Sequence, residues 1–353
     1  MRHVVVLCGG RSAEHEVSLV SAASVIKNLN PDRYRISVVG IKKDGTAYSG
    51  HELAERLGLG KSDNVDHLTG HNWLASLAAL YPPPEIVFPV LHGPFGEDGT
   101  VQGALEILDL PYVGAGVWGS AVGMNKIHSK KILAGAGLPI LPWFWIDRLC
   151  WEQQRDEMVA RAESTSAYPL FIKPANLGSS IGINKSKNRA DLVAHIEDAF
   201  RYDDFIVVEK GIEAREIEVS VLGNLEPAVS VAGEIIPSRE FYTYESKYID
   251  QTSELLIPAP LSSKEMKQVQ ELALDTYRSL QLEGMARIDF LLDKQSGEFW
   301  VNEPNTIPGF TSISMYPKLW EASGLKYAEL LDRLIDLGLE RYERRKRLSV
   351  DRQ

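Results

Sequence analysis

The chain opens with an apolar run, a pair of glycines and a segment of helical spacing, all within residues 3–29. Apolar runs at 35–41 and 86–93, followed by a helical pattern at 99–110, continue the alternation. Strands that alternate with helices form a parallel sheet with helices on its faces. The pattern therefore predicts an α/β domain over residues 1–114.

The middle of the chain has strands, helices and a glycine–serine loop in a different order. The expected elements are a helix at 125–137, a strand at 168–174, the loop at 176–182, a helix at 189–200 and a strand at 205–210. The first helix ends where glycine follows its last apolar position. We assign this second domain to residues 115–209.

The third unit, residues 210–353, begins with alternating positions. Ile217, Val219 and Val221 fall on one face, as in a half-buried strand. An amphipathic helix is expected at 327–339, and we interpret the basic run after it, "RYERRKR", as a solvated helix end favoured by the helix dipole. The three units predict an α/β protein with α+β character in the second and third.

A hairpin in the third unit places two carboxylates opposite each other. Arg287 and Asp289 share a face of its first strand, and Glu303 and Asn305 share a face of its second. A three-residue turn centred on Ser296, with glycine last, sets Asp289 opposite Glu303. The same register sets Arg287 opposite Asn305.

Two facing carboxylates predict chemistry at this hairpin. Like charges whose Cβ atoms are ~5 Å apart repel by roughly 3 kcal/mol at an effective dielectric of 20. Either one carboxyl is protonated or a cation lies between them, and the Asn305 amide oxygen favours the cation. An all-oxygen set suits Mg²⁺ or Mn²⁺ and not zinc. Arg287 beside the cation would hold an oxyanion or phosphate. The alternative to a cation site is an exposed hairpin face whose charges are merely solvated.

Composition narrows the class of protein. The 353 residues are enough for two or three domains, and a net charge of -10 argues against a general nucleic-acid binder. Two cysteines, Cys8 and Cys150, indicate no disulfide framework. No apolar run approaches the ~18 residues of a membrane span, and none resembles a signal peptide. We therefore expect a cytoplasmic protein without nucleic-acid or membrane partners.

The glycine–serine loop "KPANLGSSIG" is a candidate phosphate site. Gly178 and Gly182 free the backbone, Ser179 and Ser180 supply hydroxyls, and Lys173 supplies a positive charge. The loop is not a P-loop, and the glycine pair near the N-terminus does not match the dinucleotide fingerprint. Cation ligands, a lysine and a glycine loop are the parts that phosphoryl transfer requires.

The order of eight motifs resembles a known family. They are "SAEHEVS", "LHGPFGEDGTVQG", "MNKIHSK", "KPANLGSSIG", "EKGIEAREIEV", "YTYESKY", "ARIDF" and "NEPNTIPGFTS". Across about residues 1–340 the set is similar to the D-alanine–D-alanine ligases of the ATP-grasp superfamily. The resemblance implies a three-domain ATP-grasp architecture with a Rossmann-like N-terminal domain, ATP between the central and C-terminal domains, and a homodimer.

The resemblance also implies which residues hold the nucleotide. The phosphates fall to Lys126, Lys173, Lys247, Gly178 and Ser180, the adenine to backbone groups at Glu209, Lys210 and Ile212, and the ribose to Glu216. Two Mg²⁺ or Mn²⁺ ions fall to Asp289, Glu303 and Asn305. These are the side chains that the hairpin register selects, and K⁺ is a further candidate cation.

The implied reaction joins two D-alanine molecules for peptidoglycan synthesis. The first carboxylate attacks the γ-phosphate of ATP to give an acylphosphate, and the second amine then displaces phosphate. The implied residues are Glu14 for the first ammonium, His92 near the first carboxylate, Arg287 and the Gly309 N–H for the oxyanion, Ser314 and Met315 for the second carboxylate, and Ser179 and Tyr248 bonded to Glu14.

Two alternatives to this function remain. One is an ATP-grasp ligase that makes D-alanyl-D-lactate or D-alanyl-D-serine, although Tyr248 within "SKY" favours an amine nucleophile. The other is a catalytically silent nucleotide-binding module, which is expected to lack a cation ligand, and none is missing here. Simpler interpretations of two residues also remain: a structural histidine for His92 and a plain loop serine for Ser179.

Overall fold

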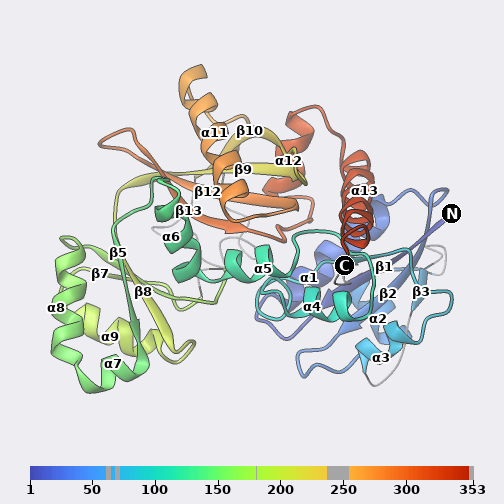
Figure 1. Ribbon diagram of the computed structural model, residues 1–353, viewed down its shortest axis with the longest axis horizontal. Coiled ribbons are helices and arrows are strands. Elements are labelled where there is room, and N and C mark those ends of the chain that lie inside the picture. The colour runs from blue at the N-terminus through green and yellow to red at the C-terminus, as the bar shows by residue number, and fades with distance from the viewer. Residues whose placement is uncertain (61–64, 68–71, 180, 237–253, 350–353) are drawn as a thin grey trace.

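The computed structural model describes residues 1–60, 65–67, 72–179, 181–236 and 254–349. Three sheets carry the fold, and each has its own helices (Figure 1). Within these ranges, no helix combines the length and the apolar character needed to cross a bilayer.

The N-terminal sheet is parallel, as the alternating pattern predicts. Its strands lie in the order β3 (Val65–His67), β2 (Tyr34–Ile41), β1 (Arg2–Gly9) and β4 (Ile86–Pro89). The accompanying helices are α1 (His15–Asn28), α2 (Gly50–Leu57), α3 (Trp73–Ala78) and α4 (Thr100–Ile107). Side chains from Val4 to Cys8 are fully buried, because packing covers both faces of the sheet.

The middle sheet is antiparallel and uses its two faces differently. Its strands lie in the order β5 (Trp143–Asp147), β8 (Phe205–Lys210), β6 (Leu170–Pro174) and β7 (Asn184–Ser186). One face packs on α7 (Arg148–Gln153), α8 (Arg155–Thr165) and α9 (Arg189–Ala199). Two helices, α5 (Val117–Met124) and α6 (Lys126–Gly135), precede this sheet in the chain. Ile127 of α6 packs with Val207 on the other face of the sheet.

The third sheet is also antiparallel and has one apolar and one polar face. Its strands lie in the order β11 (Glu254–Leu256), β10 (Ala228–Ile236), β9 (Ala214–Gly223), β12 (Gly284–Asp293) and β13 (Phe299–Asn305). Ile217, Val219 and Val221 share a core with α11 (Ser263–Ser279), which confirms the predicted alternation. The mixture of parallel and antiparallel sheets confirms the fold class, whereas the three domain ranges remain a prediction.

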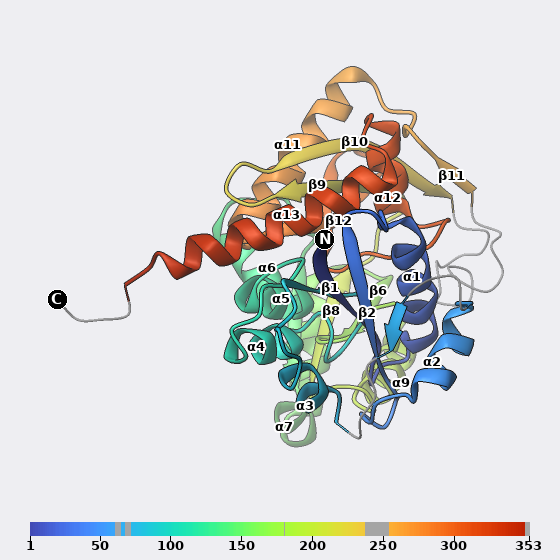
Figure 2. The same cartoon turned by 90° about the vertical axis from the view of Figure 1, so that its right-hand side faces the viewer.

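The C-terminal helix α13 (Tyr327–Lys346) returns to the N-terminal sheet. Leu330, Leu331 and Leu334 lie in the same core as Val4 of β1. Figure 2 shows α13 crossing the molecule beside β12, and α13 also contacts β4 of the first sheet. The last helix of the chain therefore joins the first sheet to the third.

The interpretation of "RYERRKR" as a solvated helix end is wrong for its first residue. Arg341 is 3% exposed and donates hydrogen bonds to the carbonyls of Tyr112, at 2.9 Å, and Gly114. Arg345, one turn later, bonds the carboxylate of Glu106. The run continues the buried stripe of α13, because positions 334, 338 and 341 follow one another at helical spacing.

Candidate active site

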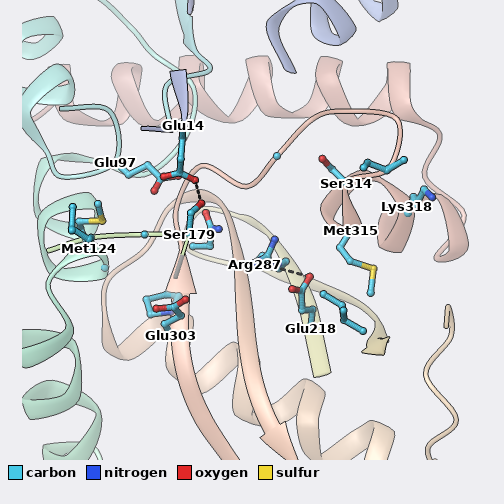
Figure 3. Close-up of a pocket in the computed structure, with 18 of the residues that line it drawn as sticks. Glu14, Glu97, Met124, Ser179, Glu218, Arg287, Glu303, Ser314, Met315 and Lys318 are labelled. Carbon is cyan, nitrogen blue, oxygen red and sulfur yellow. Dashed lines mark hydrogen bonds and ion pairs between the residues drawn. The ribbon is translucent and has the colours of Figure 1, made fainter. Parts of the chain in front are cut away.

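A cavity of about 410 Å³ is bordered by segments from all three parts of the chain (Figure 3). Glu14 and Ser179 lie at one end, and Ser314 and Met315 lie at the other, at the start of α12 (Met315–Ala322). Further lining residues between and around these ends are Glu97, Gly178, Lys126, Glu218, Arg287, Glu303, Asn305, Gly309 and Lys318.

The hairpin has the predicted register at its functional end. Asp289 pairs with Glu303, and Arg287 pairs with Asn305. The predicted three-residue turn is wrong by one residue, because the Asp293 N–H donates to the Glu298 carbonyl at 3.0 Å and leaves a four-residue loop.

A β-bulge corrects the register between the turn and the site. Phe290 pairs with Val301, so Asn302 is an extra residue on β13. The Asp293 carboxylate accepts the Gln295 N–H at 2.7 Å, which organises the longer loop. The final residue of that loop, Gly297, has the expected positive φ of 72°.

The facing carboxylates are accompanied by cationic side chains of the protein. The Arg287 guanidinium donates to both oxygens of Asp289, each at 2.7 Å. The Lys126 Nζ lies 3.4 Å from the Glu303 Oε2 and donates to the Leu177 carbonyl at 2.5 Å. A guanidinium and an ammonium thus neutralise the repulsion that the register creates.

A third carboxylate, Glu218 on β9, belongs to the same group. It pairs with Asp289 across β9 and β12, and its Oε2 lies 2.9 Å from the Arg287 Nε. Glu218 is not among the residues predicted from the sequence. The alternation of Glu216, Glu218 and Ser220 could have placed it on the polar face, but the pairing of β9 with β12 is not readable from a single sequence.

The oxygens of the hairpin fit a divalent cation. The Asn305 Oδ1 is buried and accepts no hydrogen bond within the described part of the chain. The Glu303 side chain is 35% exposed and borders the cavity. The carboxylate oxygens of Asp289 already accept hydrogen bonds from Arg287. The described residues contain no group of three His, Cys, Asp or Glu side chains arranged around a cation position. A hard cation would therefore bind the oxygens of Asn305 and Glu303 before those of Asp289.

Two lysines share one buried carboxylate beside the hairpin. Lys173 Nζ lies 2.6 Å from the Glu209 Oε2 and 3.2 Å from the Asn302 Oδ1. Lys130, which the sequence analysis missed, bonds the other oxygen of Glu209. Burial opposes ionisation of Glu209, but Lys130 and Lys173 outweigh it and lower the pKa of Glu209 to about 2. The bulge residue Asn302 thereby connects the hairpin to this lysine cluster.

The glycine–serine loop reaches the N-terminal domain at the other end of the cavity. Ser179 Oγ donates a hydrogen bond to the Glu14 carboxylate, as expected from the resemblance (Figure 3). Ser179 has a φ of 51°, which non-glycine residues rarely adopt. Lys247, Tyr248 and Ser180 lie outside the described residues.

His92 lies behind the cavity and does not border it. Its Nδ1 lies 2.9 Å from the Ile307 carbonyl, and its Nε2 lies 3.1 Å from the Ser21 hydroxyl. Burial opposes charging of His92, but Glu97 outweighs it and raises its pKa. Glu97, also missed by the sequence analysis, borders the cavity, and burial raises its pKa to about 7.

The remaining predicted residues fall into two places. Gly309 borders the cavity beside Ser314, and a Cβ there would lie only 2.6 Å from the Ser314 Oγ. Ser314 accepts the Thr311 N–H at 3.0 Å. Of the predicted adenine and ribose residues, Lys210 ends β8, Ile212 lies in the β8–β9 connection and Glu216 lies in β9. None of these three borders the cavity.

Comparison with known proteins identifies the family of this chain. Residues 3–115 match the family model for the D-ala D-ala ligase N-terminus, and residues 132–336 match the model for its C-terminus. The chain belongs to the D-alanine–D-alanine ligase family. A relative named D-alanine–D-alanine ligase from Heliobacterium modesticaldum is 48% identical over 99% of this chain and 98% of its own.

Solved structures of D-alanine–D-alanine ligase family proteins superimpose over nearly the whole chain. The ligase from Coxiella burnetii has a TM-score of 0.80 and 37% identity and covers 98% of this chain and 96% of its own. The VanG D-Ala:D-Ser ligase from Enterococcus faecalis has a TM-score of 0.80 and 34% identity and covers 96% and 99%. Membership confirms the ATP-grasp fold, the use of ATP and a general dependence on divalent cations. The roles of individual residues stay predictions.

Proposed function

We propose that this chain ligates two D-alanine molecules to D-alanyl-D-alanine, with hydrolysis of ATP to ADP and phosphate, for peptidoglycan precursor synthesis. The observation that carries the proposal is the pairing of Asp289 with Glu303 beside a buried Asn305 oxygen and the Arg287 guanidinium. Oxygen ligands that would hold divalent cations, with a guanidinium on the same sheet face, suit the stabilisation of a phosphoryl group in transfer.

The first half of the proposed reaction uses the Glu14 end of the cavity. Glu14, held by Ser179, would bind the ammonium of the first D-alanine. The carboxylate of this first D-alanine then attacks the γ-phosphorus of ATP. The bond from that phosphorus to the β,γ-bridging oxygen breaks, and ADP leaves. Lys126 and Lys173 would hold the phosphates, because Lys126 lies beside Glu303 and Lys173 lies beside Asn302, both on β13.

The second half uses the Ser314 end. Ser314 and Met315 would bind the carboxylate of the second D-alanine, whose free amine attacks the acylphosphate carbonyl. Arg287 and the Gly309 N–H would stabilise the oxyanion, and phosphate leaves as the carbonyl re-forms. Aligning the two reactants in one cavity of about 410 Å³ supplies much of the rate.

Asp289, Glu303 and Asn305 would hold Mg²⁺ or Mn²⁺, two ions per site, with K⁺ as a further candidate. Such ions supply charge neutralisation to the phosphoryl group when bound. The proposal also includes a homodimer and a cytoplasmic location.

The test is phosphate release by the purified chain with ATP and Mg²⁺, supplied with D-alanine alone, with L-alanine alone, or with D-alanine together with D-serine or D-lactate. We expect release with D-alanine and formation of D-alanyl-D-alanine. A preference for D-serine or D-lactate as the second substrate at neutral pH would contradict the proposed specificity. Nucleotide binding without any D-alanine-dependent release would instead indicate a silent module.

A further inference from the structure

We propose that Glu218 is a positioning residue that keeps the Arg287 guanidinium aimed into the cavity when Asp289 turns to a divalent cation. The inference deepens the proposed function and rests on it. It concerns a side chain that belongs to neither the predicted cation ligands nor the predicted substrate contacts.

Three carboxylates stand in one row across three strands. Asp289 on β12 pairs with Glu303 on β13 at one side and with Glu218 on β9 at the other. The proposed cation ligands occupy β12 and β13, because Asn305 also lies on β13. Glu218 is thus separated from the cation position by the width of a strand.

Arg287 connects this row by contacting two of its carboxylates. Its Nε and Nη2 bond the two oxygens of Asp289, and its Nε also lies 2.9 Å from the Glu218 Oε2 (Figure 3). The Arg287 side chain is 13% exposed and the Glu218 side chain 6%. At this burial, loss of a sole anionic partner would leave an uncompensated charge, which is strongly destabilising.

Cation binding removes the first of these partners. A carboxylate that ligates a divalent cation directs its lone pairs to that ion, and the ion repels a neighbouring guanidinium. Asp289 therefore cannot serve both groups equally, whereas Glu218 stays available on the far side of β12. Arg287 keeps one anionic anchor and its direction toward the cavity.

Direction matters because Arg287 is proposed to stabilise the oxyanion. Removing one such donor typically costs about 10²–10³ in kcat, and a displacement of about 1 Å can cost about 10²-fold. Two other roles for Glu218 make different predictions. As a third cation ligand it would control cation affinity, and as an amine site it would control binding of the second D-alanine without acting through Arg287.

The experiment measures Glu218→Ala and Glu218→Gln, each alone and combined with Arg287→Lys, in the full chain. Readouts are kcat, the KM values for ATP and D-alanine, and calorimetric binding of Mn²⁺ with a non-hydrolysable ATP analogue in the absence of D-alanine. We expect Glu218→Ala to lower kcat roughly 10²-fold, and Glu218→Gln roughly 10-fold, because the amide oxygen still accepts a hydrogen bond. Analogue affinity and both KM values should stay within about twofold.

The double variant decides whether Glu218 acts through Arg287. If it does, Glu218→Ala combined with Arg287→Lys should be about as slow as Arg287→Lys alone, because the two losses overlap. The inference would be overturned if the losses in kcat of the two single variants multiply in the double variant. It would also be overturned if Glu218→Ala binds Mn²⁺ more weakly, shows a selective rise in the KM of D-alanine, or has an unchanged kcat. Wild-type protein that makes no dipeptide would instead refute the proposed function itself.

Glu234 provides a matched control on the same sheet. It is also a buried glutamate in an arginine pair, bonded to Arg215 at 2.8 and 2.7 Å. It pairs with Ile217, whose side chain lies in the core with α11, so this ion pair is on the face away from the cavity. Glu234→Gln should change thermal unfolding as much as Glu218→Gln does and leave kcat unchanged, which separates positioning from loss of stability.

Discussion

Replacing the buried Lys130 with methionine is expected to weaken nucleotide binding, although Lys130 is not one of the proposed phosphate lysines. Lys130 and Lys173 share the Glu209 carboxylate, and all three side chains are buried. If Lys173 turns to a phosphate as proposed, Lys130 remains as the partner of Glu209. In Lys130→Met, either Glu209 is left unpaired or Lys173 stays bound to it.

The pKa of Glu209 sets the size of the effect. Burial opposes its ionisation, but the two lysines lower its pKa from 4.5 to about 2, which corresponds to about 3 kcal/mol. If Lys130 accounts for half, its loss costs on the order of 1–2 kcal/mol, or about a tenfold rise in the nucleotide dissociation constant. The same carboxylate stabilises the fold above pH 4.5, and this contribution is lost as pH falls toward about 2.

The assay is calorimetric titration of a non-hydrolysable ATP analogue with Mg²⁺ into wild type, Lys130→Met and Lys131→Met. Lys131 is the next residue of the same helix, is exposed, and lies over the Trp145 ring. Its variant should bind the analogue like wild type. Equal affinity in Lys130→Met and Lys131→Met, with both variants folded, would refute the idea that Lys130 frees Lys173 for phosphate.

Three further changes test other parts of the site. Glu303→Gln should lower D-alanine-dependent phosphate release by roughly 10³-fold or more while the melting temperature stays within a few degrees, because the change also relieves repulsion with Asp289. Burial raises the pKa of Glu97 to about 7, so the folded protein keeps a proton there that the unfolded chain releases near pH 4.5. The free energy of unfolding of wild type should therefore decrease as pH rises from about 4.5 to 7. In denaturant titrations, the stability of Glu97→Gln relative to wild type should be greater at about pH 8 than at about pH 4.5. Arg341→Met should lower the free energy of unfolding by about 3 kcal/mol in urea titrations, because two buried carbonyls lose their donor, whereas the exposed Arg347→Met should not.

The hairpin shows which parts of the site a sequence can predict. A period of two places Arg287 with Asp289, and Glu303 with Asn305, on one face of each strand. The pairing of Asp289 with Glu303 then fixes the register as far as the next bulge. The turn was predicted one residue too short, because the Asp293 carboxylate organises a longer loop. The bulge at Asn302 corrects the pairing before it reaches the functional end.

Lys130, Glu218 and Arg341, whose roles could not be predicted from the sequence, all depend on contacts between distant segments. Lys130 meets Glu209 across 79 positions of the chain, and Arg341 reaches the Gly114 carbonyl across 227. No local period marks such partners. Glu218 looks like an ordinary outward-facing strand residue until β12 is placed beside β9. The family resemblance assigned roles to motif residues but could not reveal the buried partners that hold those residues.

Both charged clusters of the site have the same arrangement. In one, Glu209 is shared by Lys130 and Lys173, and in the other Arg287 is shared by Glu218 and Asp289. A simple buried ion pair could not release one partner to a ligand without leaving the other uncompensated, at a cost of about 3–5 kcal/mol. A shared group avoids this, because one partner can leave while the second stays. In the proposed function, Lys173 would thus be able to meet a phosphate and Asp289 a cation, while the two sheets beneath them keep their buried charges compensated.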